Sequence, residues 1–498
     1  MAMRVERDRD NATAPPPSMK KEKTMKKVVP VVGILPIACS RFRGMGKETP
    51  TLYENRVQTR LNEIQDKCEA FSRVVNPGQI YTKDDVGKAI ELFFEKKVDC
   101  VFAFFLSWSE DSAWIRFLRD MFPLPVFYAH IRPEIRYTNT EKEDDFIEYL
   151  STGGLVGALE GSGPFKRFSR PMSFTGCGDV DEIMREVEPF ALGAAVRRDL
   201  RDSTFALIGG YPEIMWSTYC DPFTYFSKVG PLLHFVPIAH LKDAYDAVDE
   251  KRVDACVKAL LRTYETRGKI ETEHFKASVQ CSLAVEDAAK KVGAEMVILN
   301  DGNSALFEQI GLRPGFYPTP ENKGEVAVVP EGDLGLGLAT YIALKLTGKH
   351  VNVVEPFYIE KDGRVKCGHA GPNDYTDPSG STIIGRDIRF ARSGYKHAGA
   401  PFAWYVMPEN GKKTMLHCSQ GKDGRYKLVA TTCESVAMEH ELASYSHGCI
   451  RFPGRDPNEI FGALLSEGVT QHYALVDGNI LKELSYLARI LDFDYIEI

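Results

Sequence analysis

The sequence lacks the cysteine patterns of a disulfide framework or a structural zinc site. It has 11 cysteines, an odd number, and no two of them form a Cys-x-x-Cys motif. Small secreted scaffolds and zinc ribbons depend on such regular spacing. We therefore expect reduced thiols and a cytoplasmic protein.

Common nucleotide-binding motifs and a nucleic-acid footprint are also missing. There is no Gly-x-x-x-x-Gly-Lys-Ser/Thr phosphate loop, and no Gly-x-Gly-x-x-Gly follows the turn at Gly209-Gly210. The formal net charge of −7 gives no excess of positive charge for nucleic acid or an anionic membrane. No apolar run reaches the roughly 20 residues that span a bilayer. We expect neither nucleic acid nor a membrane as a partner.

Residues 1–27 lack the hydrophobic pattern of a folded element. They mix charges with a proline run at 15–17, which predicts a disordered extension. The apolar run that follows, Val28 to Cys39, imitates a secretory signal peptide. Because Pro30 and Pro36 interrupt it, and no small-residue cleavage site follows, we interpret the run as a buried first strand.

What is present is typical of a soluble α/β protein. The 498 residues, 44% hydrophobic and 26% charged, suffice for two to four domains. Short apolar strands alternate with amphipathic helices over 28–178 and again over 179–325. This alternation predicts parallel sheets covered on both faces. We expect two consecutive Rossmann-like domains with these limits.

The pattern changes in residues 326–498. After a helix-like segment at 334–346, short β-like runs are separated by Gly, Asp and Asn, and a helix-like segment at 480–491 follows. Many short strands with turn residues between them are typical of an antiparallel sheet or barrel. We expect a β-rich, barrel-like C-terminal domain.

This C-terminal region contains the candidate site. Glu331 precedes the helix-like segment, Glu355 ends a β-like run, and His369 follows after a hairpin; His472 comes near the C-terminus. Two acids with one or two imidazoles form an oxygen and nitrogen ligand set for a divalent metal such as Mn²⁺ or Mg²⁺. Taken singly, each residue also has a structural explanation; Glu331, for example, is favourable at a helix start.

This order of elements resembles the L-fucose isomerase and L-arabinose isomerase superfamily, of which the chain is a distant member by this resemblance. The resemblance covers nearly all of the chain after residue 28 in order and spacing. The passages that carry it are Gly33-Ile34-Leu35-Pro36, Pro330-Glu331-Gly332-Asp333, Val353-Val354-Glu355, Cys367-Gly368-His369 and Gln471-His472-Tyr473-Ala474-Leu475.

The resemblance implies a metal-dependent aldose–ketose isomerase that acts on an open-chain sugar through a cis-enediolate. It implies that Glu331, Glu355 and His472 bind the metal, with Mn²⁺ preferred over Mg²⁺ or Co²⁺, and that the two glutamates share the acid and base roles. His369 would be a ligand or a substrate contact. The resemblance also implies a homo-oligomer, trimer to hexamer, whose sites border a neighbouring subunit's first domain.

Three further residues are candidate substrate contacts: His447, Arg451 and Trp404. The His447-Gly448-Cys449 passage also suggests a cysteine nucleophile, but adjacency in sequence does not give the spatial pairing that such catalysis needs. A core position is the alternative for Trp404. Which sugar is the substrate, and which glutamate takes the carbon-bound proton, both stay open.

Two other classes of function remain as alternatives. Two consecutive α/β domains also describe sugar-binding receptors without catalysis, although that class leaves the acid-rich third region unexplained. A metal-dependent aldolase or epimerase would use a similar enediolate site. Metal binding separates the enzymes from the receptor, and product analysis separates the enzymes from one another.

Overall fold

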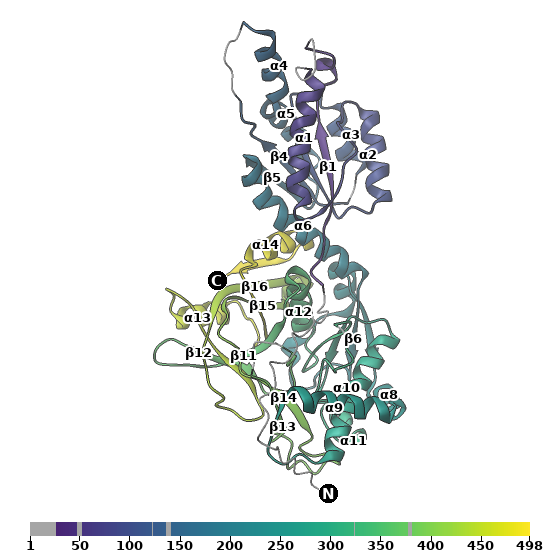
Figure 1. The fold of residues 1–498 in the computed structure, drawn as a ribbon, viewed down its shortest axis with the longest axis vertical. Coiled ribbons are helices and arrows are strands. Elements are labelled where there is room, and N and C mark those ends of the chain that lie inside the picture. Colours follow the sequence, from purple (N-terminus) through teal and green to yellow (C-terminus); the bar gives the residue numbers. More distant parts are fainter. Residues whose placement is uncertain (1–25, 47–51, 122, 136–140, 323, 377–380) are drawn as a thin grey trace, which may run out of the picture. The chain divides into compact units, whose positions relative to one another are not determined.

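The computed structural model describes residues 26–46, 52–121, 123–135, 141–322, 324–376 and 381–498 (Figure 1). These fall into two compact units, which are considered separately. The smaller unit holds Val28–Asp199 and Lys482–Leu491, and the larger unit includes Leu200–Leu481 and Asp492–Ile498. The predicted disordered extension lies, up to residue 25, outside the described residues. The predicted domain limits at 178 and 325 stay predictions.

The smaller unit is built on a five-stranded parallel sheet, as its alternating pattern predicts. The strand order is β2-β1-β3-β4-β5. The apolar run after residue 28 is indeed a buried strand, β1. The strands are β1 Val31–Ile37, β2 Arg73–Val75, β3 Cys100–Phe105, β4 Val126–Ile131 and β5 Ser173–Gly178. The helices are α1 Tyr53–Glu69, α2 Lys83–Glu95, α3 Ser112–Asp120, α4 Glu143–Thr152, α5 Gly154–Arg167, α6 Val180–Asp202 and α14 Leu481–Leu491.

The larger unit begins with a four-stranded parallel sheet of order β10-β9-β6-β7. Its strands are β6 Thr204–Ile208, β7 Leu232–Val236, β9 Met296–Leu299 and β10 Ala327–Val329. Its helices are α7 Pro222–Thr224, α8 Ile238–Ala247, α9 Glu250–Thr263, α10 Thr272–Lys291, α11 Ser304–Gln309 and α12 Leu334–Thr347. The second predicted α/β region is therefore also a parallel sheet with helices.

The β-rich region of the larger unit is a closed antiparallel barrel. Its strand order is β15-β18-β11-β12-β17-β16, and β16 pairs with β15 to close the ring. These strands are β11 Val351–Ile359, β12 Val365–His369, β15 Gly411–Gln420, β16 Tyr426–Val436, β17 Ser446–Arg451 and β18 Tyr473–Asp477. Outside the ring lie α13 Pro457–Ser466, β19 Asp494–Glu497, which adds to β16 in parallel, and a small sheet of β8 Glu265–Arg267, β13 Ile383–Arg386 and β14 Pro401–Trp404. The barrel prediction is confirmed.

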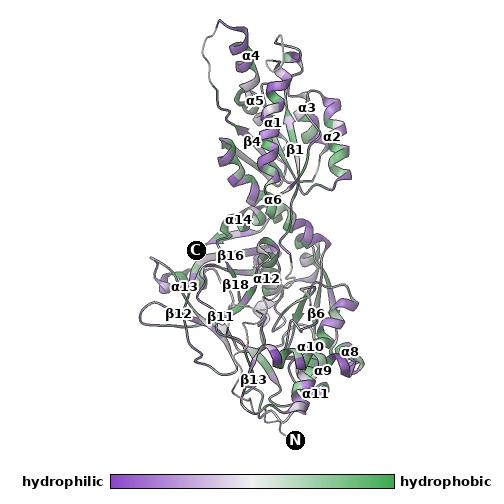
Figure 2. Ribbon diagram, in the orientation of Figure 1, coloured by the Kyte–Doolittle hydropathy of each residue, from purple (hydrophilic) through white to green (hydrophobic). Residues whose placement is uncertain are grey.

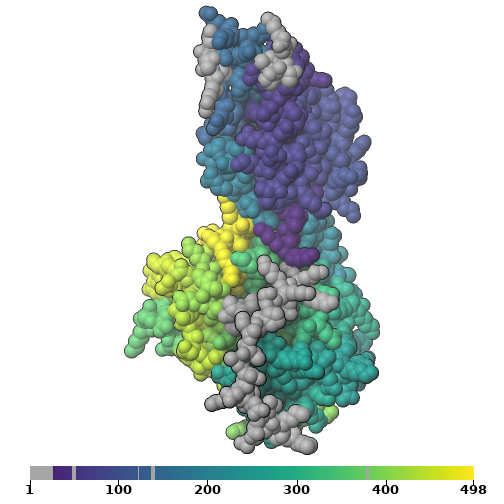
Figure 3. Space-filling model, in the orientation of Figure 1, coloured from purple at the N-terminus to yellow at the C-terminus, as the bar shows by residue number. Residues whose placement is uncertain are grey.

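Helix α12 connects the two parts of the larger unit. Nearly all of its residues are buried, and it packs against barrel strands β15 and β18 as well as β9 and β10 of the parallel sheet. Surface helices such as α1 and α2 instead show both hydrophilic and hydrophobic residues (Figure 2). Figure 3 shows the surface of the larger unit, with the barrel residues in green to yellow and residues 200–310 in teal. Contact on both sides explains why α12 has no polar face.

The close approach of α12 to the barrel depends on Gly335. A Cβ at this position would lie 2.1 Å from the carbonyl oxygen of Cys418 in β15. We expect Gly335→Ala to lower the free energy of unfolding by about 1–3 kcal/mol, because the helix must move away from the strand. Gly462→Ala in the exposed face of α13 meets no atom within 4 Å and is the control. It should stabilise by about 0.5–1 kcal/mol. Thermal unfolding of both variants tests this, and an unchanged midpoint for Gly335→Ala would contradict it.

Candidate metal centre

Three side chains from distant parts of the sequence converge in the larger unit. One ligand atom from each of Glu331, His369 and His472 lies within 4.8 Å of the other two. Both histidine side chains are fully buried, and the glutamate side chain is 17% exposed. The sequence predicted Glu331 and His472 as ligands and His369 as a ligand or substrate contact. The structure brings all three together.

Glu355 stands beside this group. Its Oε1 lies 3.4 Å from Nε2 of His472, and Oε2 of Glu331 lies 3.0 Å from the same nitrogen. The other oxygen of Glu331, Oε1, lies 3.4 Å from Nε2 of His369. Two carboxylates therefore approach Nε2 of His472: that of Glu355 from strand β11 and that of Glu331 from the loop between β10 and α12.

Barrel pairing places Glu355 and His369 on neighbouring strands and His472 directly before a third strand. Strand β11 pairs with β12 so that Glu355 lies opposite Gly368, next to His369. On its other side β11 pairs with β18, where Val354 lies opposite Tyr473, next to His472. Glu355 and His369 thus lie on paired strands and His472 directly precedes a third, so strand pairing sets the spacing of the three side chains.

Glu331 comes instead from the short loop between β10 and α12. Its backbone is left-handed, with φ of 63°, and Gly332 follows with φ of 66°. A non-glycine residue in this region costs free energy and needs outside support. The backbone N–H of Glu331 donates to Oδ1 of Asp301 at 2.9 Å, and that of Gly332 donates to the carbonyl of Leu299 at 3.0 Å. These bonds anchor the loop to the end of β9.

The sequence did not single out Asp333, whose carboxylate has two roles. Oδ1 accepts from the N–H of Leu336 at 2.9 Å and caps α12. Oδ2 lies 2.8 Å from Nδ1 of His472. Because a carboxylate only accepts, Nδ1 carries the proton and Nε2 points at the two glutamates. In the sequence, an Asp directly before a helix-like segment predicts a helix cap, but it does not predict the bond to His472.

The charges around His472 change its protonation. Burial by itself would lower the pKa of His472, but its hydrogen bonds with Asp333, Glu331 and Glu355 raise the pKa well above the ordinary value. Burial would raise the pKa of Glu331, yet His369 and His472 hold it well below its usual range. In the absence of a cation, the imidazolium of His472 is what balances the carboxylates.

The donor set suits a divalent metal ion. Within the described part of the chain, Nδ1 of buried His369 has no hydrogen-bond partner, and Nε2 has no well-formed hydrogen bond, with Oε1 of Glu331 at 3.4 Å; such a buried imidazole is costly without a ligand. Carboxylate oxygens and imidazole nitrogens together favour hard or borderline cations. Glu331, His369 and His472 can hold such an ion, with Glu355 adjacent.

The remaining predicted contacts have other partners. Nε2 of His447 accepts from the N–H of Glu441 at 3.1 Å, and its Nδ1 lies 2.7 Å from the carbonyl of Tyr445. Arg451 is exposed and pairs with Glu434. Trp404 is buried in the small sheet. None of these described contacts joins the three residues to the metal-ligand cluster, so their role as substrate contacts stays a prediction.

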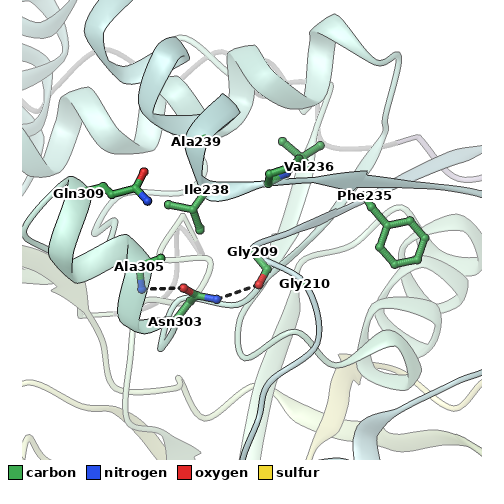
Figure 4. Close-up of a pocket in the computed structure, with 10 residues that line it drawn as sticks. Gly209, Gly210, Phe235, Val236, Ile238, Ala239, Asn303, Ala305 and Gln309 are labelled. Carbon is green, nitrogen blue, oxygen red and sulfur yellow. Dashed lines mark hydrogen bonds between the residues drawn. The ribbon is translucent and has the colours of Figure 1, made fainter.

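A separate cavity of about 390 Å³ lies at the carboxyl ends of β6 and β7. Figure 4 shows the Asn303 amide bonded to Ala305 and to the carbonyl of Gly209, on the wall of this cavity. The glycine turn also borders the Glu331 loop, because a Cβ on Gly332 would lie 3.4 Å from the carbonyl oxygen of Gly210.

The chain matches no family model and no curated protein sequence. Across the described ranges, no helix has the length and apolarity that crossing a membrane requires.

Metal binding should release a proton from His472. Because its raised pKa keeps the imidazole protonated near neutral pH, an ion at Nε2 must displace that proton. We expect about one proton released per Mn²⁺ and an apparent affinity that rises about tenfold per pH unit below this pKa. Titration calorimetry in two buffers of different ionisation enthalpy measures both quantities.

Asp333→Asn is the matched control for this experiment. Asparagine still caps a helix and still accepts from Nδ1, but it removes the negative charge that helps to raise the pKa of His472. The pH dependence should therefore move to lower pH in this variant. An Mn²⁺ affinity that stays constant from about pH 6 to about pH 8 in the wild type would contradict the assignment of His472 as a ligand.

Proposed function

We propose that this protein is a metal-dependent aldose–ketose isomerase that acts on an open-chain sugar through a cis-enediolate. The observation that carries the proposal is the meeting of Glu331 and Glu355 at Nε2 of His472, with buried His369 completing the set. Mn²⁺ is the preferred ion, with Mg²⁺ or Co²⁺ as alternatives. The resemblance to L-fucose and L-arabinose isomerases supports the same reaction.

When bound, the ion would supply Lewis acidity to adjacent hydroxyl and carbonyl oxygens of the sugar. Glu331, His369 and His472 would hold it. Aldose–ketose conversion also needs a base that takes the proton from C2 and returns it to C1, while a second proton moves between O2 and O1. These proton transfers fall to the side chains of the chain itself.

The two glutamates differ in how firmly they are held. Glu331 contacts two imidazoles, and its pKa is held low, which suits a ligand that stays ionised. Glu355 has one contact in the cluster, at 3.4 Å, and its side chain is 25% exposed. We assign the carbon-bound proton to Glu355 and a mainly ligating role to Glu331.

We also propose a cytoplasmic homo-oligomer, from trimer to hexamer. Large apolar side chains are exposed on both units. In the larger unit, Ile214 is 90% and Trp216 75% exposed; in the smaller unit, Leu159 on α5 is 66% exposed. Such side chains are typical of subunit contacts. The proposal that sites border a neighbouring subunit rests on the family resemblance.

Deuterium exchange tests the reaction directly. We expect the metal-free protein, incubated with pentoses, hexoses, 6-deoxy sugars and anionic sugars in D₂O, to interconvert an aldose and its ketose only when Mn²⁺ is added. Mass spectrometry and proton NMR at C1 and C2 detect the incorporated deuterium. Cleavage of the carbon chain would instead identify an aldolase, and inversion at C2 without a ketose an epimerase. Sugar binding without exchange would identify a receptor.

Substitutions in the cluster should abolish this turnover and leave the fold intact. We expect Glu331→Gln and His472→Ala to reduce it by about 100–10,000-fold, the range for loss of a positioned acid–base group. Glu308→Gln, at an exposed position of α11 in the same unit, is the control and should keep full activity. Circular dichroism checks the fold. Near-normal activity in either cluster variant would show that the site is wrongly placed.

A further inference from the structure

A single buried arginine, Arg313, contacts residues that adjoin or support two of the ligand candidates, His369 and Glu331. The side chain of Arg313 is 3% exposed. Its Nε and Nη2 donate to Oδ2 of Asp387 at 3.1 and 2.8 Å. Its Nη1 donates to the carbonyl of Ala370 at 3.0 Å and lies 3.7 Å from Oδ2 of Asp301.

Each of the last two contacts leads to a residue of the cluster. Ala370 directly follows His369, so its carbonyl position is tied to that of the histidine. Asp301 uses its other oxygen, Oδ1, to accept from the backbone N–H of Glu331 at 2.9 Å. One guanidinium group therefore connects the Glu331 loop with the end of strand β12.

The surroundings of Arg313 hold its guanidinium in one place. The group lies over the rings of Phe390 and Phe402, at 4.9 and 5.7 Å from their centroids. Gly371 leaves space for it, because a Cβ there would lie 2.7 Å from Nη1. A buried charge is stable only with such complete pairing. A lysine cannot replace the planar fork that reaches three acceptors at once.

We propose that Arg313 is a positioning residue, which sets the spacing between Glu331 and His369. Through Asp301 it supports the left-handed backbone of Glu331. Through the carbonyl of Ala370, which also accepts from Nη1 of Arg389 at 2.8 Å, it helps to fix the start of the segment after β12. None of its described contacts is with the side chain of Glu331, Glu355 or His472. This inference rests on the proposed function of the cluster as a metal centre.

The test uses Arg313→Lys and Arg313→Met in the full-length chain. Arg252→Met is the matched control, because Arg252 also pairs with two carboxylates, Asp287 and Glu321, in the same unit. The readouts are the Mn²⁺ dissociation constant from electron paramagnetic resonance, and amide hydrogen exchange of residues 329–333 in the metal-free protein by mass spectrometry.

We expect Arg313→Met to weaken Mn²⁺ binding by about 10–100-fold, as for other residues that orient metal ligands. Exchange in residues 329–333 should become faster. Arg313→Lys, which keeps the charge, should still fold and show the same changes to a smaller extent. Arg252→Met should leave both readouts unchanged even if it lowers the thermal midpoint, which separates positioning from general stability.

The outcomes distinguish this inference from the proposed function. If the wild type binds Mn²⁺ and both Arg313 variants bind it within about twofold of the wild type, Arg313 is not a positioning residue. If the wild type binds no Mn²⁺, the proposed function fails; the spacing role of Arg313 is then judged by hydrogen exchange alone, and unchanged exchange in Arg313→Lys overturns it.

Discussion

The carboxylate of Asp333 makes the interaction on which the candidate site depends. It caps α12 with one oxygen and bonds His472, 139 positions later in the chain, with the other. The helix packs against the parallel sheet and against the barrel, so this carboxylate connects the loop after β10 to the residue that precedes β18. Because it accepts from Nδ1, it also leaves Nε2 as the atom that faces Glu331 and Glu355. The residue that caps the start of α12 thereby determines which ring nitrogen of the distant His472 faces the glutamates.

The charges of the cluster follow from this arrangement. Asp333, Glu331 and Glu355 all approach one buried imidazole, and repulsion among them would be severe without a positive charge between them. A proton on His472 supplies that charge in the metal-free protein, and a divalent ion would supply more of it. An ion bound at Nε2 would therefore take the place of a proton, whereas a structural ion pair such as Arg252 with Asp287 is already balanced.

The sequence predicts what repeats locally and misses what depends on packing. Continuous apolar runs gave β1, β3, β6 and β9 and the parallel sheets, and short runs with turn residues gave the barrel, because strand patterns depend mainly on neighbouring residues. The order of acids and histidines, read through the family resemblance, pointed to Glu331 and His472, and the structure places both in one cluster. By contrast, Asp301 and Arg313 carry no local signal, since their partners lie at Glu331, Ala370 and Asp387. The pairing of β8 with β13 likewise joins segments more than 100 residues apart.

The glycine-rich segment at 153–163 shows a different limit of sequence reasoning. Its composition gives no helical pattern, yet it forms most of α5. The reason is close packing: a Cβ at Gly157 would lie 2.7 Å from the ring of Phe105, and one at Gly161 would lie 2.5 Å from the hydroxyl of Tyr128. The same principle operates at Gly335, where absence of a side chain lets α12 approach β15. In both places glycine lowers helix propensity and permits contact, and the contact decides the structure. At Gly335 the contact also affects the site. Gly335 follows Asp333 by two positions, so a shift of the helix would move the carboxylate that orients His472.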